Sequence, residues 1–292
     1  NGTMTARKAL YTSRNVPAVQ TFREVKTEDK KKFLSNLGIE TEEIYESDAL
    51  GGGNITVSPI QMAASYAAFG NSGLYTDPYS IVKIEYRDGT VENFKPDTKV
   101  AMNEGTAYMV TDILRDTVSG QSDSFASRAA VRGVDVAGKT GTTNYSSEEF
   151  QQYKLKSGSV PDTWFVGYSP EFSIAIWSGY EKRSEAITTW NERYLPQRLY
   201  ASIMGDLKGL VDNTTFKKPS SLVEATIEVG TVPLKLASEH TPAELRSTEL
   251  FFKGTVPTEV STKYEAPEVP TPIISSATYN DVGQTIDVSW TH

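Results

Sequence analysis

The sequence has 292 residues and a mass of 32.1 kDa, which is more than one average domain needs and predicts one large core with a smaller part beside it. It is 38% hydrophobic and 23% charged, as globular proteins are, and no apolar run approaches the roughly 20 residues that span a bilayer, so we expect no membrane contact from this chain. Lysine and arginine total 29 against 37 aspartates and glutamates, and the net charge of −8 argues against nucleic acid as a partner.

The first half of the chain predicts helices and one hairpin. In chain order these are a helix broken near its middle over residues 3–25, a helix over 58–70, a hairpin over 79–94 and a helix over 104–118. The second helix has a clear start, because Ser58 can cap it and Pro59 fits its first turn. Asp88 and Gly89 form a strong turn between two segments of period two.

The second half of the chain predicts strands joined by short turns. Strands are expected over residues 134–143, 164–168 and 172–177, followed by a helix over 195–210. Helices followed by adjacent strands with short connections predict an α+β domain with an antiparallel sheet. After Phe216, seven prolines break up any long helix, which predicts irregular strand and linker. Residues 273–290 resemble the first two strands of a small β-sandwich.

Two scarce residue types exclude several kinds of site. The chain has no cysteine, which excludes disulfides, thiolate nucleophiles and thiolate zinc sites. It has only two histidines, His240 and His292, so a His-Glu-x-x-His metal motif is absent and a Ser/His/Asp triad would depend on one of these two. We expect both to be solvated side chains. No metal and no cofactor are expected, and the proton carriers of any active site would be Lys, Asp, Glu or Tyr.

Lys139 lies in a segment that fits two motifs. Residues 133–140 match the phosphate-binding pattern Gly-x-x-x-x-Gly-Lys-Thr, but a P-loop needs a strand before its first glycine and a helix that begins at the lysine. Here the strand pattern lies inside the supposed loop, which argues against an NTPase. Alternatively, Lys139, Thr140 and Thr142 present a cation and two hydroxyls on a strand, which is a carboxylate-binding surface. A solvated edge strand with a protective lysine would carry the same residues.

Ser13 and Asn15 would add a hydroxyl and an amide to the cation of Lys139. Four segments, in the family's order, resemble the transpeptidase domain of Gram-positive class A penicillin-binding proteins: residues 13–15, 58–71, 139–142 and 162–168. The resemblance covers about residues 1–210.

The resemblance implies an α+β fold of the serine β-lactamase and DD-peptidase type, with an antiparallel sheet flanked by helices. It implies three parts: the C-terminal part of a transpeptidase domain over residues 1–215, a proline-rich β linker over 216–270, and the start of a fibronectin type III-like domain over 271–292. It also implies a protein at the extracellular face of the bacterial cell membrane, anchored through a segment upstream of this sequence.

The resemblance further implies a mechanism. In this family, the serine of a Ser-x-x-Lys motif attacks the D-Ala-D-Ala bond of a peptidoglycan stem peptide and passes the acyl group to an amine on a neighbouring stem, and β-lactams acylate the same serine. By resemblance, Ser13 relays a proton to the leaving nitrogen, and Lys139 keeps this relay poised electrostatically. Asn15 hydrogen-bonds the acyl-side amide of the substrate.

The remaining implied roles belong to the strand that follows Lys139. Thr140, Gly141 and Thr142 bind the substrate and hold its terminal carboxylate, and the Thr142 backbone N–H forms one arm of the oxyanion hole. Strict alternation places Thr140 and Thr142 on the face opposite Lys139. Lys139 must therefore curl over the strand edge, or the strand must twist.

One departure from the family concerns the nucleophile. The family's Ser-x-x-Lys motif precedes Ser13 by some tens of residues, and only twelve residues precede Ser13 here. The one Ser-x-x-Lys in the chain begins at Ser80 and ends at Lys83, on a predicted strand where positions three apart face opposite sides. We therefore expect a preceding fragment or chain to carry the nucleophile. The resemblance also implies that the full protein includes a glycosyltransferase domain.

Alternative functions remain open on the residues alone. A D,D-carboxypeptidase or a β-lactamase would use the same groups with water as the acceptor. A non-catalytic β-lactam sensor or wall-binding module would keep the pocket without transfer. Turnover of penicillin, or a persistent adduct without transfer to D-amino acids, would separate these from a transpeptidase.

Overall fold

The structure is a computed structural model that describes residues 4–119, 124–210, 212, 214–265 and 271–291. The chain divides into two compact units, one formed by residues 1–224 and 250–256 and the other by 225–249 and 257–292. His292 lies outside the described residues, while His240 is about half exposed, as expected of a solvated side chain. In the described residues, no helix is both long and apolar enough to cross a membrane.

The N-terminal helices are those predicted, with one addition. The broken helix consists of α1 (Ala6–Tyr11) and α2 (Asn15–Glu24), which begins two residues after Ser13. A further helix, α3 (Thr27–Asn36), was not predicted, because its run of lysines hides the few apolar residues that set a helical period. A short 3₁₀ turn, η1 (Glu46–Leu50), follows it.

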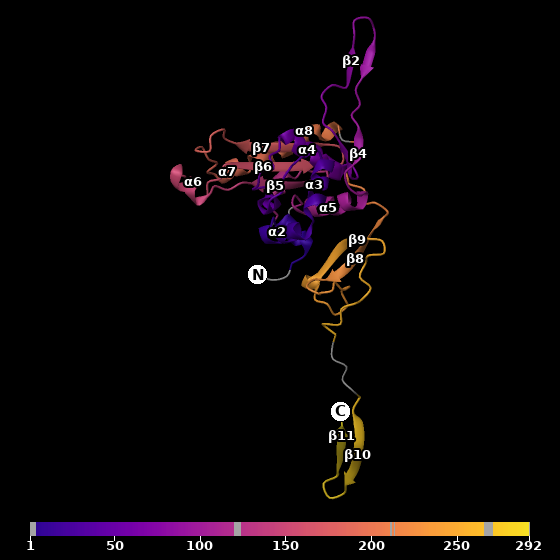
Figure 1. Ribbon diagram of the computed structural model, residues 1–292. Coiled ribbons are helices and arrows are strands. Elements are labelled where there is room, and N and C mark those ends of the chain that lie inside the picture. Colours follow the sequence, from indigo (N-terminus) through magenta and orange to yellow (C-terminus); the bar gives the residue numbers. More distant parts are fainter. Residues whose placement is uncertain (1–3, 120–123, 211, 213, 266–270, 292) are drawn as a thin grey trace. The chain divides into compact units, whose positions relative to one another are not determined.

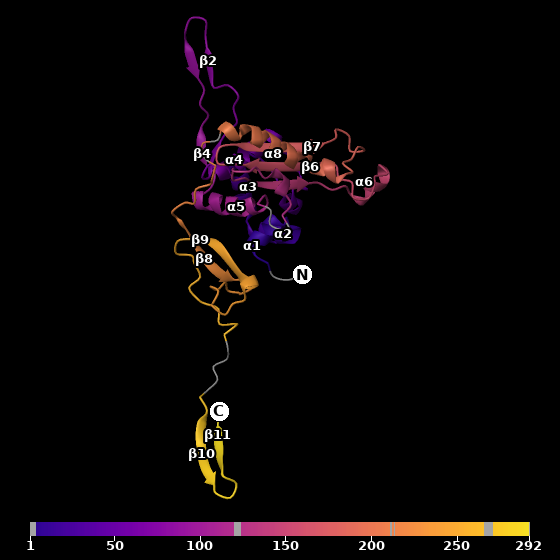
Figure 2. The same cartoon turned by 180° about the vertical axis from the view of Figure 1, so that it is seen from behind.

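The capped helix is confirmed as α4 (Pro59–Gly70), and Ser58 and Gln61 form a reciprocal capping box at its start. The predicted hairpin is β2 (Lys83–Glu85) paired with β3 (Val91–Asn93), around a turn in which Gly89 takes a positive φ of 86°. Its strands are shorter than predicted. It projects away from the helices and the central sheet (Figures 1 and 2).

Two short strands flank this hairpin in sequence, and a long helix follows it. These elements are β1 (Leu74–Thr76), β4 (Thr98–Val100), α5 (Glu104–Asp116) and the 3₁₀ turn η2 (Ser127–Ala129). β1 pairs antiparallel with β4. Asn103 caps α5 and accepts a hydrogen bond from the Gly105 N–H at 2.8 Å.

The central sheet has three antiparallel strands in the order β5–β6–β7 (Figure 1). The strands are β5 (Ala137–Thr142), β6 (Asp162–Tyr168) and β7 (Ser173–Gly179), and the helices around them are α6 (Ser147–Gln152), α7 (Trp190–Arg193) and α8 (Leu195–Leu207), with the 3₁₀ turn η3 (Lys208–Leu210). Side chains on the two faces of β6 pack differently: the Phe165 ring contacts Tyr200 of α8, and the Tyr168 ring contacts Tyr66 and Phe69 of α4. Helices therefore cover both faces, and the predicted α+β class is confirmed.

The strand that contains Lys139, β5, begins later than predicted. Val134 and Val136 alternate in sequence and are both buried, but the strand starts at Ala137. Both valines belong to a core cluster with Phe165 and Met204, so their alternation reflects burial against a core without pairing in the sheet.

The C-terminal part of the chain holds two further two-stranded sheets. Their elements are β8 (Leu222–Glu228), the 3₁₀ turn η4 (Ala243–Leu245), β9 (Arg246–Phe252), β10 (Ile273–Asn280) and β11 (Thr285–Thr291). β8 pairs with β9, and β10 pairs antiparallel with β11. The two predicted strands over residues 273–290 are confirmed, whereas the likeness to a fibronectin type III domain stays a prediction.

Candidate active site

Ser13 and Lys139, which are 126 positions apart in sequence, meet in space. The Lys139 Nζ donates a hydrogen bond to the Ser13 Oγ at 2.7 Å. Ser13 lies in the turn between α1 and α2, with a φ of 52°, a left-handed conformation that is uncommon for a residue with a side chain. Its N–H donates to the Leu10 carbonyl, so the end of α1 fixes the position of its backbone. Strained backbone of this kind recurs at functional sites.

Lys139 reaches Ser13 by curling over the edge of β5. Its Nζ also donates to the carbonyl of its own neighbour, Thr140, at 3.2 Å. Of the two arrangements that strand alternation allowed, the structure therefore has the curled side chain. Burial of the ammonium lowers the pKa of Lys139 to about 8. At neutral pH the ammonium therefore remains mostly protonated, and it loses its proton at mildly alkaline pH.

The backbone directly before Lys139 is held by contacts that the sequence did not predict. The hydroxyl of the buried Thr117, one residue past α5, shares its single proton between the carbonyls of Gly138 and Leu114. A Cβ on Gly138 would meet the Phe165 Cζ at 2.6 Å and the Val166 carbonyl oxygen at 2.8 Å. Glycine is thus required here for β5 to lie this close to β6. In the sequence, a glycine before a lysine at the start of a buried strand is the signal that could have indicated this close approach.

The other predicted site residues lie near these two in the chain. Asn15 is the first residue of α2, and its side chain is exposed. Thr140, Gly141 and Thr142 form the outer half of β5, where burial decreases until Thr142 is exposed. In the described part of the chain, β5 pairs along one edge only, with β6. No described strand pairs with its other edge, along which an extended ligand could lie.

The Ser-x-x-Lys sequence in the hairpin forms no catalytic pair. Ser80 precedes β2, Lys83 begins it, and both are exposed. The Lys83 ammonium pairs with the carboxylate of Glu85. A serine needs its lysine one helical turn away on the same face, and this segment has no helix.

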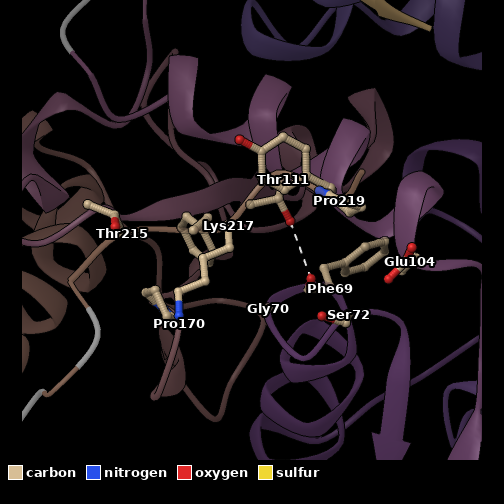
Figure 3. Close-up of a pocket in the computed structure, with 11 residues that line it drawn as sticks. Phe69, Gly70, Ser72, Glu104, Thr111, Pro170, Thr215, Lys217 and Pro219 are labelled. Atoms are coloured by element: carbon tan, nitrogen blue, oxygen red, sulfur yellow. Dashed lines mark hydrogen bonds between the residues drawn. The ribbon is translucent and has the colours of Figure 1, made fainter. Parts of the chain in front are cut away.

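A separate pocket of about 180 Å³ lies against α5, on the side that faces α4 (Figure 3). It is lined by eleven residues, none of which is a predicted site residue. Lys217 and Glu104 lie on opposite sides of it, and the Thr111 hydroxyl on its wall bonds the Phe69 carbonyl at 3.5 Å (Figure 3). Acyl-transfer chemistry therefore has its candidate groups at Ser13 and Lys139, outside this pocket.

Two known protein families match this chain. The family described as "Penicillin binding protein transpeptidase domain" matches residues 1–178, which include α1, the turn with Ser13 and the whole of β5. The chain belongs to this family. The C-terminal domain family of penicillin-binding protein 1A matches residues 218–266.

Curated relatives confirm the expected resemblance to class A penicillin-binding proteins of Gram-positive bacteria. Penicillin-binding protein 1A/1B of Bacillus subtilis is 38% identical over 300 residues, covering 100% of this chain and 32% of the relative. Penicillin-binding protein 1A of Streptococcus oralis is 37% identical over 210 residues, covering 70% of this chain and 32% of the relative. The chain thus spans about a third of the length of these relatives.

Solved structures confirm the predicted fold. Penicillin-binding protein 1A from Haemophilus influenzae aligns with a TM-score of 0.70 at 19% identity, over 88% of this chain and 41% of that one. PonA1 from Mycobacterium tuberculosis in complex with penicillin V aligns with a TM-score of 0.59 at 26% identity, over 75% of this chain and 60% of that one. The fold is that of a penicillin-binding protein transpeptidase domain.

Proposed function

We propose that this chain supplies one side of the active site of a serine-type D-Ala-D-Ala transpeptidase, which cross-links peptidoglycan stem peptides and is acylated by β-lactams. The observation that carries the proposal is the 2.7 Å hydrogen bond from Lys139 to Ser13, beside the open edge of β5, in a member of this family. A related protein, PonA1, has been solved with penicillin V bound, which supports the ligand class.

The direction of this hydrogen bond suits a proton relay. An ammonium has three donors and no acceptor, so Lys139 donates to the Ser13 Oγ and leaves the serine's own proton free for another acceptor. During acylation a serine oxygen forms a bond to the carbonyl carbon, the C–N bond breaks, and the leaving nitrogen takes a proton. The proton that the nucleophilic serine loses passes through the lysine of its Ser-x-x-Lys motif to Ser13, and Ser13 gives its own proton to the leaving nitrogen, so that Ser13 is a neutral hydroxyl before and after the step. The Lys139 ammonium stabilises the negative charge that develops in the transition state.

The strand that follows Lys139 would bind the substrate. Thr140, Gly141 and Thr142 hold the terminal carboxylate, and the Thr142 N–H serves as one arm of the oxyanion hole. Asn15 bonds the acyl-side amide. The free edge of β5, the exposure of Thr142 and the cation of Lys139 support this assignment, because a carboxylate needs charged or N–H donors that remain accessible.

We propose that the nucleophile lies in an N-terminal segment that carries Ser-x-x-Lys. The exposed positions of Ser80 and Lys83 support this, as does the greater length of the relatives. β7 offers a docking edge: among the described strands it pairs only with β6, and its Trp177 side chain is 42% exposed. A strand from that segment would pair with the backbone N–H and C=O groups along the unpaired edge of β7 and cover the Trp177 indole.

The relatives also support the wider setting. We propose that the full protein acts at the outer face of the bacterial cell membrane, anchored by a segment outside this chain, and that it carries a peptidoglycan glycosyltransferase domain as well. The relatives named penicillin-binding protein 1A or 1A/1B, about three times as long as this chain, are the basis for both statements.

Labelling of the full-length protein with fluorescent penicillin tests the assignment. Ser13→Ala and Lys139→Met should slow acylation by roughly 100-fold or more, as loss of a positioned proton carrier does. The paired controls, Ser80→Ala and Lys83→Met, should label like the wild type. Mapping the labelled peptide by mass spectrometry should place the acyl group outside residues 1–292. An acyl group on a serine of this chain would refute the placement of the nucleophile.

Transfer assays separate the alternatives. A transpeptidase should pass the acyl group from a stem-peptide donor to an added D-amino acid, whereas release of the free acid alone would indicate a carboxypeptidase. Rapid turnover of penicillin would indicate a β-lactamase. A stable adduct with no transfer to any amine would indicate a sensor.

A further inference from the structure

Five charged side chains connect the helix before Ser13 to the segment before Lys139. The two terminal guanidinium nitrogens of Arg7, on α1, bond Asp112 at 2.6 Å and Asp116 at 2.7 Å, both on α5. Arg115 of α5 lies 3.7 Å from the other oxygen of Asp112 and 3.1 Å from Asp135. These residues, called the ion cluster below, are only partly exposed, with Arg7 at 19% and Asp135 at 26%.

The two carboxylates of the ion cluster that lie on α5 oppose each other within that helix. Asp112 and Asp116 are four residues apart, so two like charges lie on one face of the helix. Asp116 is the last residue of α5, where the helix dipole disfavours negative charge. Within α5, Asp112 has one partner, Arg115 at i+3, whereas Asp116 lies where the helix itself disfavours it. Arg7 offsets both effects through a tertiary contact, which indicates that these charges serve the junction between α1 and α5.

The ion cluster lies close in sequence to both catalytic candidates. Arg7 is six residues before Ser13, and Asp135 is four residues before Lys139. Apolar packing joins the same three elements, because Leu10 of α1 packs against a buried cluster formed by Leu114 of α5, Ala137 of β5 and Tyr168 of β6.

α5 is therefore the common support of the Ser13 turn and of β5. At the end of α5, the Thr117 hydroxyl bonds the carbonyl of Gly138, directly before the lysine. α5 can therefore fix the Ser13 turn and β5 relative to each other without backbone pairing between them.

We propose that Arg7 and Arg115 are positioning residues that hold Ser13 and Lys139 at hydrogen-bonding distance by fixing α1 and β5 to α5. The proposal rests on the proposed function, because it assigns these arginines to the acylation step. Neither arginine touches the substrate. They act on the acylation rate by raising the fraction of molecules in which Ser13 is hydrogen-bonded to Lys139.

The experiment measures acylation by fluorescent penicillin in the full-length protein. The variants are Arg7→Met, Arg115→Met and Arg7→Lys, and the rate constant is expressed per labelled site, so that unfolded protein is not counted. Arg23→Met is the matched control: Arg23 bonds Glu46 through two nitrogens, but both side chains are largely exposed and neither connects to β5. The pH dependence of the rate is recorded for each variant.

Arg7→Met should lower the acylation rate constant by roughly fivefold to tenfold, as loss of two partly buried ion pairs suggests. Arg7→Lys, which keeps the charge but reaches one carboxylate at a time, should recover part of that loss. Acylation should slow at alkaline pH as the Lys139 ammonium loses its proton, and this fall in rate is the alkaline limb of the pH profile. If Lys139 separates from Ser13 and becomes hydrated, its pKa rises from about 8 toward its ordinary value, so the alkaline limb should move to higher pH. A merely structural defect would lower the labelled fraction without moving this limb.

Three results would overturn the proposal: wild-type rates with an unmoved alkaline limb in Arg7→Met and Arg115→Met, an equal loss in Arg23→Met, or a loss confined to the labelled fraction. Failure of the proposed function gives a different pattern. In that case Ser13→Ala and Lys139→Met would acylate normally, whatever the arginine variants do.

Discussion

A methyl group at Gly138 tests how tightly the start of β5 is built. In Gly138→Ala the new Cβ would lie 2.6 Å from the Phe165 Cζ, 2.8 Å from the Val166 carbonyl oxygen and 3.1 Å from the Gly167 Cα. The ring can turn aside, but two of the three contacts are backbone atoms of the paired strand. β5 must therefore move away from β6 by several tenths of an ångström, and the backbone that carries Lys139 moves with it.

The expected cost follows from overpacking in a closely packed core, which is typically about 1–3 kcal/mol. At about 2 kcal/mol, the melting temperature of a domain of this size falls by roughly 4–8 °C. Thermal unfolding of the full-length protein measures this, and the shift of the transition on penicillin binding identifies the domain concerned. Acylation should slow as well, because the 2.7 Å contact with Ser13 depends on the position of β5.

Gly205→Ala is the matched control for the same chemical change. Gly205 lies in α8 with nothing within 4 Å of its added Cβ, so alanine should stabilise the helix by about 0.5–1 kcal/mol. Opposite signs for the two variants are expected. An unchanged or higher melting temperature in Gly138→Ala would refute the close approach of β5 to β6.

Two further predictions concern the candidate site. Because burial lowers the pKa of Lys139 to about 8 and the ammonium is the form that donates to Ser13, acylation should decline above pH 8, to about a tenth of its maximum near pH 9. A rate that stays constant to pH 10 would contradict a role for the ammonium. Thr142→Ala should slow acylation by penicillins and cefotaxime-like ligands while changing stability by less than about 0.5 kcal/mol, since the Thr142 side chain is exposed. A loss above about 2 kcal/mol would instead indicate a structural hydroxyl.

Local signals in the sequence predicted most of the elements that build the fold. Ser58 and Pro59 mark the start of α4, because a cap and a first-turn proline act within four residues. The turn at Gly89 is equally local, since its positive φ is readily adopted by glycine. The start of the strand that contains Lys139 was predicted too early, because burial of Val134 and Val136 in a non-strand segment imitates the alternation of a strand.

The meeting of Ser13 and Lys139 could not follow from local signals. A hydroxyl and an ammonium so far apart in the chain approach only because α1 and β5 both pack on α5, and no spacing rule within either segment encodes that. The sequence-based prediction of their proximity depended on resemblance to a family. The curl of the Lys139 side chain toward Thr140 likewise depends on the free strand edge, which is a property of the assembled sheet.

A residue that is unfavourable in its own helix is a local sequence feature that can predict such a tertiary contact. Asp116 at the C-terminal end of α5 is unfavourable in an isolated helix, so its presence predicts a cation from elsewhere in the chain. The cation is Arg7, and the helix that carries it ends at the turn of Ser13. Residues that oppose the propensity of their own element thus indicate where the fold uses charge to hold distant segments together. In this chain, the segments held are those that bring a hydroxyl to an ammonium.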